Sequence, residues 1–86
     1  MELPRESFEW CGESYSIRDM TIREMRTLEA LPRETTTEQM DFTIRMICIV
    51  LEGPGRVRYT SESFQDSFPF EFIPIAMAAY EAAKKK

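Results

Sequence analysis

The chain has 86 residues, which is enough for one small domain spanning residues 1–86. It carries 11 Lys and Arg against 15 Asp and Glu, a net charge of −4, and it has no histidine. Nucleic-acid binding needs a concentrated basic face, so this balance argues against a nucleic-acid partner. No apolar run approaches the roughly 20 residues that cross a membrane, and residues 1–20 lack the apolar core of a signal peptide. We therefore expect a cytoplasmic protein.

The two cysteines point to structure rather than to chemistry. A structural zinc site needs four Cys or His ligands, and the chain offers only Cys11 and Cys48. A disulfide between them is disfavoured in a reducing cytosol. Cys48 lies in an apolar run and is expected in the core, whereas Cys11 adjoins Gly12 at a predicted turn and is expected to be exposed.

Residues 7–17 predict a β-hairpin. Phe8 and Trp10 alternate with polar residues, and Tyr15 and Ile17 do the same after the turn. Gly12 supplies the positive φ that a two-residue connection requires. A hairpin of this size is marginal alone in water, so its aromatic face must pack on the helices that follow.

Two helices are predicted next, over residues 21–31 and 37–52. Thr21 and Glu24 form a capping box at the start of the first, and Pro32 ends it. The second begins with a capping box at either Thr35 or Thr36, is apolar on nearly all sides, and ends at Gly53 as its C′ residue. An all-round apolar helix is a buried one, so we expect residues 37–52 to be the central element.

A short helix over 60–67 and a last helix over 69–84 complete the prediction. Pro74 lies inside the last helix, so we expect a kink near residue 74 or a 3₁₀ first turn. The predicted fold is α+β and mostly α, with the N-terminal hairpin packed on a three-helix core. The expected core residues are Trp10, Tyr15, Ile17, Met25, Leu28, Ile44, Ile47, Cys48 and Leu51.

No set of residues in the sequence predicts catalysis. The most frequent general base, histidine, is absent, and the three glycines form no phosphate-binding loop. Neither cysteine has an activating partner in the sequence. We therefore expect a protein that is not an enzyme and that needs no cofactor or metal.

Aromatic residues near the C-terminus are the best candidates for binding a partner. Phe68, Phe70 and Phe72 alternate, so a regular helix cannot bury all three rings on one face. Some of this apolar area is expected to stay open for another protein. The candidate partner-binding residues are Phe64, Phe68, Phe70, Phe72 and Met77.

Residues 8–31, FEWCGESYSIRDMTIREMRTLEAL, resemble the opening of phage tail assembly chaperones. Members of that family begin with a strand, a glycine turn, a second strand and a helix, and Tyr15–Arg18 followed by Thr21–Met25 match this order. The resemblance implies a chaperone in the host cytoplasm that binds the tape measure protein, keeps it soluble and recruits tail tube protein, with homo-oligomers possible. The alternatives are a structural tail or virion component and a small bacterial adaptor that binds one partner.

Overall fold

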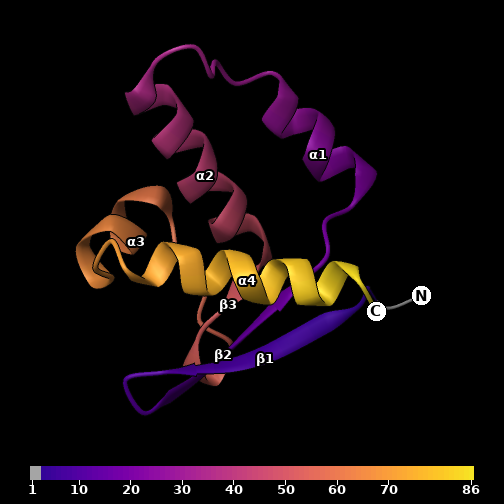
Figure 1. Ribbon diagram of the computed structural model, residues 1–86, viewed down its shortest axis with the longest axis vertical. Coiled ribbons are helices and arrows are strands. Elements are labelled where there is room, and N and C mark those ends of the chain that lie inside the picture. Colours follow the sequence, from indigo (N-terminus) through magenta and orange to yellow (C-terminus); the bar gives the residue numbers. More distant parts are fainter. Residues whose placement is uncertain (1–2) are drawn as a thin grey trace.

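The structure is a computed structural model that describes residues 3–86, and within them it combines one small sheet with four α-helices. In Figure 1 the sheet lies at the bottom, α4 crosses above it, and α2 and α1 extend beyond α4. None of the helices in this described range is long and apolar enough to span a membrane. The elements are β1 Arg5–Trp10, β2 Glu13–Arg18, α1 Ile22–Glu29, α2 Thr36–Val50, β3 Leu51–Glu52, the 3₁₀ turn η1 Pro54–Arg56, α3 Ser61–Ser67 and α4 Phe72–Lys84.

The predicted hairpin is present and is longer than residues 7–17. Strands β1 and β2 pair antiparallel from Arg5 opposite Arg18 to Trp10 opposite Glu13. The two connecting residues, Cys11 and Gly12, have φ values of 50° and 79°. Positive φ at both positions is what a primed two-residue turn requires, because its twist matches that of the paired strands.

Capping boxes set the beginnings of α1 and α2, as the sequence predicts. Thr21 accepts a hydrogen bond from the Glu24 N–H, and the Glu24 carboxylate accepts one from the Thr21 N–H. Thr35 and Glu38 form the same reciprocal pair, which decides between the two predicted starts of the second helix. The side chains thus satisfy N–H groups that have no partner within the helix.

The predicted end of the second helix is wrong. Helix α2 stops at Val50, and Leu51 and Glu52 pair with β2 as a third strand that the sequence did not predict. Gly53 has φ −87° and is therefore not a left-handed C′ residue. A glycine is needed there for another reason, since a Cβ at this position would lie 2.5 Å from the Tyr59 hydroxyl oxygen.

The last helix begins three residues later than predicted and has no kink at Pro74. Helix α4 starts at Phe72, which makes Pro74 the third helical residue, where an N–H has no partner within the helix. The turn before it has the i→i−3 bonds of a 3₁₀ turn, the other expected alternative, from the Phe72 N–H to the Pro69 carbonyl and from the Ile73 N–H to the Phe70 carbonyl. The proline therefore costs the helix no hydrogen bond.

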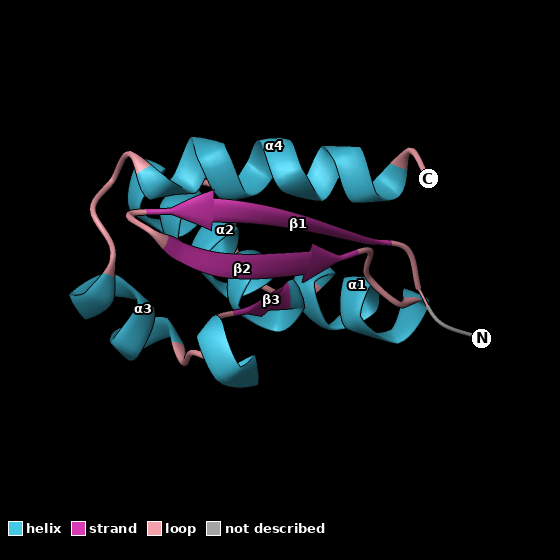
Figure 2. Cartoon of the chain, turned by 90° about the horizontal axis from the view of Figure 1, so that it is seen from below, coloured by secondary structure: helices cyan, strands magenta, loops and turns pink. Residues whose placement is uncertain are grey.

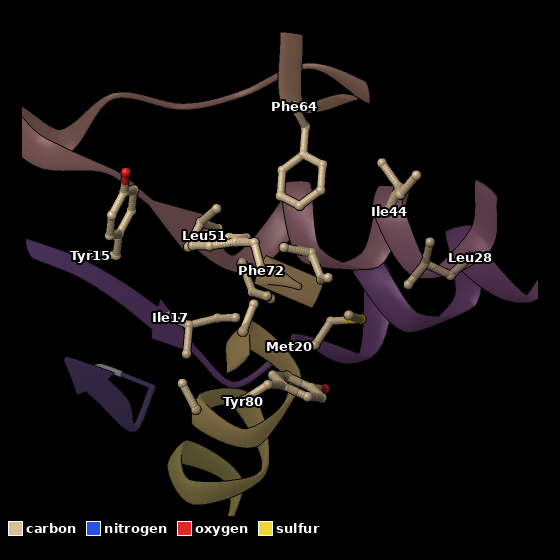
Figure 3. Packing of buried hydrophobic residues seen from close by; sticks show 13 residues of the cluster. Tyr15, Ile17, Met20, Leu28, Ile44, Leu51, Phe64, Phe72 and Tyr80 are labelled. Atoms are coloured by element: carbon tan, nitrogen blue, oxygen red, sulfur yellow. The ribbon is translucent and has the colours of Figure 1, made fainter. Parts of the chain in front are cut away.

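Helix α4, and not the predicted central helix, covers the hairpin (Figure 2). Its fully buried Phe72 ring lies 5.5 to 5.9 Å from the rings of Phe8, Trp10 and Tyr15. Helix α2 buries only one stripe, so the expectation of all-round burial is wrong. Figure 3 shows the core between these layers, and its buried hydrophobic residues are Tyr15, Ile17, Met20, Leu28, Ile44, Ile47, Val50, Leu51, Phe64, Phe72, Ala76, Ala79, Tyr80 and Ala83.

Three of the expected core residues are not fully buried. Met25 is 48% exposed, because α1 is only eight residues long and turns a single side chain, Leu28, fully into the core. Met20, just before the helix, is the methionine that packs inside. Trp10 and Cys48 are half-buried and pack against the outside of the core.

An ion pair between Arg18 and Glu24 joins the sheet to two helices. The guanidinium donates to both carboxylate oxygens at 2.9 and 2.8 Å and also to the Ile49 carbonyl at the end of α2. Arg58 donates to the same carbonyl. Helix α2 has no basic residue in its last turn, so these two arginines satisfy carbonyls that its own sequence leaves open.

We predict that Phe72→Ala costs about 3–5 kcal/mol of unfolding free energy, because it empties the ring's site in a closed core. Phe70→Ala is the matched control, since Phe70 is 68% exposed and its loss should stay within about 0.5 kcal/mol. Chemical denaturation followed by far-ultraviolet circular dichroism measures both. Equal losses in the two variants would contradict the assigned core.

We predict that Glu24→Gln lowers stability at pH 7 by about 1–2 kcal/mol. Arg18 lowers the pKa of Glu24 from 4.5 to about 2, so the ionised side chain stabilises the folded state above pH 4.5. That stabilisation is lost as the pH falls from 4.5 towards 2. The difference in unfolding free energy between wild type and Glu24→Gln should therefore shrink to zero over this pH range, as measured by denaturation at a series of pH values. Glu29→Gln, at an exposed position of the same helix, is the control and should change stability at pH 7 by no more than about 0.5 kcal/mol.

Candidate binding groove

An apolar groove lies where α2, α3 and the start of α4 meet. It consists of two adjoining hollows of about 450 and 240 Å³ that share Met40, Ile44 and Gln65. Met40 and Ile44 are four residues apart on α2 and so lie on one face of it. The smaller hollow is completed by side chains from α3, the connecting turn and α4, namely Phe64, Phe68, Pro69, Phe70 and Ile73.

The structure divides the predicted aromatic site between core and surface. Phe64 and Phe72 are 2% and 0% exposed, so neither ring forms open surface as expected, although Phe64 lines the smaller hollow. Phe68 is half-buried, with its ring stacked on Phe72 at 4.1 Å between centroids. Phe70 alone stays open, at 68% exposure. Met77 is half-buried against the core and lines neither hollow.

Backbone geometry accounts for this division. Phe68 ends α3 with extended φ and ψ of −125° and 142°, so the chain leaves helical geometry there. Pro69 then starts a turn that directs Phe70 outward before α4 begins with the buried Phe72. The alternation of Phe68, Phe70 and Phe72 predicted that one helix cannot bury all three rings. The turn between α3 and α4 explains why Phe70 is the ring that stays outside the core.

Sequence reasoning missed the part that α2 contributes to the groove. Ile44 is predicted in the core and is indeed buried, but one side of it also forms the floor of both hollows. Met40 is half-buried and lines both hollows beside Ile44. The four-residue spacing of Met40 and Ile44 was visible in the sequence, whereas their position opposite Phe64 depends on contacts between distant segments.

The charge around the groove is acidic. Glu38 and Asp41 line the larger hollow, and no lysine or arginine lines either one. Residues 60–83 contain Glu62, Asp66, Glu71 and Glu81 and no basic residue at all. Five of the eight arginines line other hollows, and one of these, Arg45, pairs with Asp41 at 3.1 Å. The groove thus combines an apolar floor with acidic side chains at its rim, of which Asp41 is already paired.

A third hollow of about 340 Å³ lies between α1, α2 and residues 58–61, and Cys48 lines it. Burial raises the pKa of the Cys48 thiol to about 11. The thiol is therefore protonated at neutral pH and is a poor nucleophile. Within residues 3–86, no group of three or more His, Cys, Asp or Glu side chains is placed to hold a metal ion.

Comparison of the chain with protein-family models, with curated proteins and with solved structures finds no match in any of the three.

We predict that Cys11 and Cys48 differ sharply in alkylation at about pH 8. Cys11 is exposed and should react readily, whereas Cys48 is half-buried and its raised pKa leaves little thiolate at this pH. Mass spectrometry after brief treatment with iodoacetamide should find the label almost entirely on Cys11. Denaturant should make the two cysteines react alike. Equal labelling of the folded protein would contradict the placement of Cys48.

Proposed function

We propose that this domain is a phage tail assembly chaperone that binds and solubilises the tape measure protein and helps to recruit tail tube subunits. Two arguments support the proposal. The order of hairpin and helix in residues 8–31 resembles that family, and the acidic-rimmed apolar groove suits the capture of an apolar segment. The groove is the observation that carries the proposal, because it offers a surface for a protein and no catalytic group.

The occupant that we propose for the groove is an amphipathic helix of the tape measure protein. Such a helix would place apolar side chains against Met40, Ile44 and Phe70, as helix-in-groove recognition does elsewhere. Its flanking side chains would include Lys or Arg, since Glu38 carries a negative charge at the rim. Covering these apolar faces would keep the client from aggregating until tail tube subunits displace the chaperone.

Co-expression with the tape measure protein tests the proposal. Wild type should raise the soluble yield of the client, and Met40→Ser combined with Phe70→Ser should lose this effect. Removing two apolar contacts of this size should weaken binding at least about tenfold. Phe70 is exposed and Met40 only half-buried, so the double variant should keep its helical circular dichroism spectrum.

Ile22→Ser is the matched control, because Ile22 is 76% exposed but lies on α1, away from the groove. It should solubilise the client as wild type does. Equal loss in both variants would contradict the role of the groove. A wild type that leaves client solubility unchanged would contradict the chaperone function itself.

Mass spectrometry of purified virions separates the chaperone from a structural tail component. A chaperone is displaced during assembly and should be absent from finished particles, whereas a structural component would be present in them. The position of the gene separates both from a bacterial adaptor, because a chaperone gene should lie between the genes for the tail tube and tape measure proteins.

A further inference from the structure

Strand β1 forms one edge of the sheet, and its outer side has no strand partner within residues 3–86. In an antiparallel pair, alternate residues direct their N–H and C=O groups towards the neighbouring strand. Because the turn has two residues, Trp10 and Glu13 at its ends form a hydrogen-bonded pair. Every second residue of β1 before Trp10, namely Phe8 and Glu6, therefore also directs its N–H and C=O towards β2. Ser7 and Glu9 therefore direct their backbone groups outward, where the described residues offer them no hydrogen bond.

The residues along this edge are complementary to themselves. If a second copy pairs antiparallel about Ser7, Arg5 of each copy lies opposite Glu9 of the other, and Ser7 lies opposite Ser7. Opposite charges directly across an antiparallel pair are stabilising. The hydrogen-bonding register also fits this pairing, because Arg5, Ser7 and Glu9 are the β1 residues whose N–H and C=O groups point outward. We infer that β1 pairs with β1 of a second copy about a two-fold axis at Ser7, which joins the two sheets into one.

The contacts that Arg5 already makes are compatible with this pairing. One of its guanidinium nitrogens donates to Ser16 and to Glu52 on the far side of β2, and a guanidinium has five N–H donors in all. The Arg5 carbonyl accepts from Lys86 Nζ at 2.6 Å, which leaves its second lone pair for a strand bond. Lys86 thus covers one end of the edge and leaves its middle open.

Helix α4 presents a suitable flank on the same side. Figure 2 shows α4 running alongside β1, so a strand added at this edge would lie beside it. Tyr80 is buried, and the opposite flank of the helix carries Ile75, Ala78 and Ala82. Two of these three side chains, Ala78 and Ala82, are small, which favours a close approach of the two α4 helices in the dimer.

Sedimentation equilibrium over a range of concentrations tests the inference. Wild type should show a reversible monomer–dimer equilibrium. Ser7→Pro removes an outward N–H that makes no bond to β2, so it should raise the dimer dissociation constant at least about tenfold while far-ultraviolet circular dichroism stays unchanged. Glu9→Lys should do the same by placing like charges opposite each other. A wild type that stays monomeric, or a dimer that survives both substitutions, would overturn the inference.

Charge reversal and cross-linking test the register. Reversing all three charges, with Arg5→Glu, Glu9→Lys and Glu52→Lys, restores the internal pair and both pairs between copies, so it should restore the dimer. With Cys11→Ser as background, Ser7→Cys should be joined to its counterpart by the shortest bifunctional thiol reagents. Glu9→Cys should not, because the two substituted side chains would lie about 14 Å apart along the strands. The reverse cross-linking pattern would overturn the proposed axis.

Discussion

The ring of Phe72 is the contact on which the arrangement of the whole domain depends. It is fully buried, and its centroid lies within 6 Å of those of five other rings. Three of these rings come from the hairpin, one from Phe64 in α3 and one from Phe68 just after α3. This single position holds the last helix against the first two strands. It also fixes the segment just before it, because Phe68 must stack on Phe72 while the turn at Pro69 places Phe70 outside. The groove is thus a consequence of how the core closes.

Local signals in the sequence predicted most of the helix starts and the turn. A threonine followed three residues later by a glutamate can satisfy free backbone N–H groups locally, so Thr21 could be identified as an N-cap without knowledge of the fold. The same signal limited the second cap to Thr35 or Thr36, and the structure shows that it is Thr35. Gly12 indicated the hairpin in the same way, since few residues adopt its φ. These features depend on residues that are neighbours in the chain, which is why the sequence alone was sufficient.

Features that depend on distant neighbours were missed. Strand β3 is two residues long and carries no periodic pattern, and it exists only because β2 offers it an edge. The choice of α4 to cover the sheet could not be predicted either, because α2 and α4 both carry apolar residues on most sides and the sequence does not say which of them packs on the strands. Met25 has the spacing of a core residue, but α1 is too short to bury a second stripe. The excess of aromatic residues near the groove was visible in the sequence. That Phe70 is exposed while Phe64 and Phe72 are buried could be learned only from the fold.

The pairing of the hairpin with α4 has a consequence for the making of the protein on the ribosome. The strands that carry Phe8, Trp10 and Tyr15 are synthesised well before the helix that covers them. Lys86 even contacts Glu6, so the two ends of the described chain meet. The aromatic face of the nascent hairpin therefore stays uncovered until α4 has left the exit tunnel.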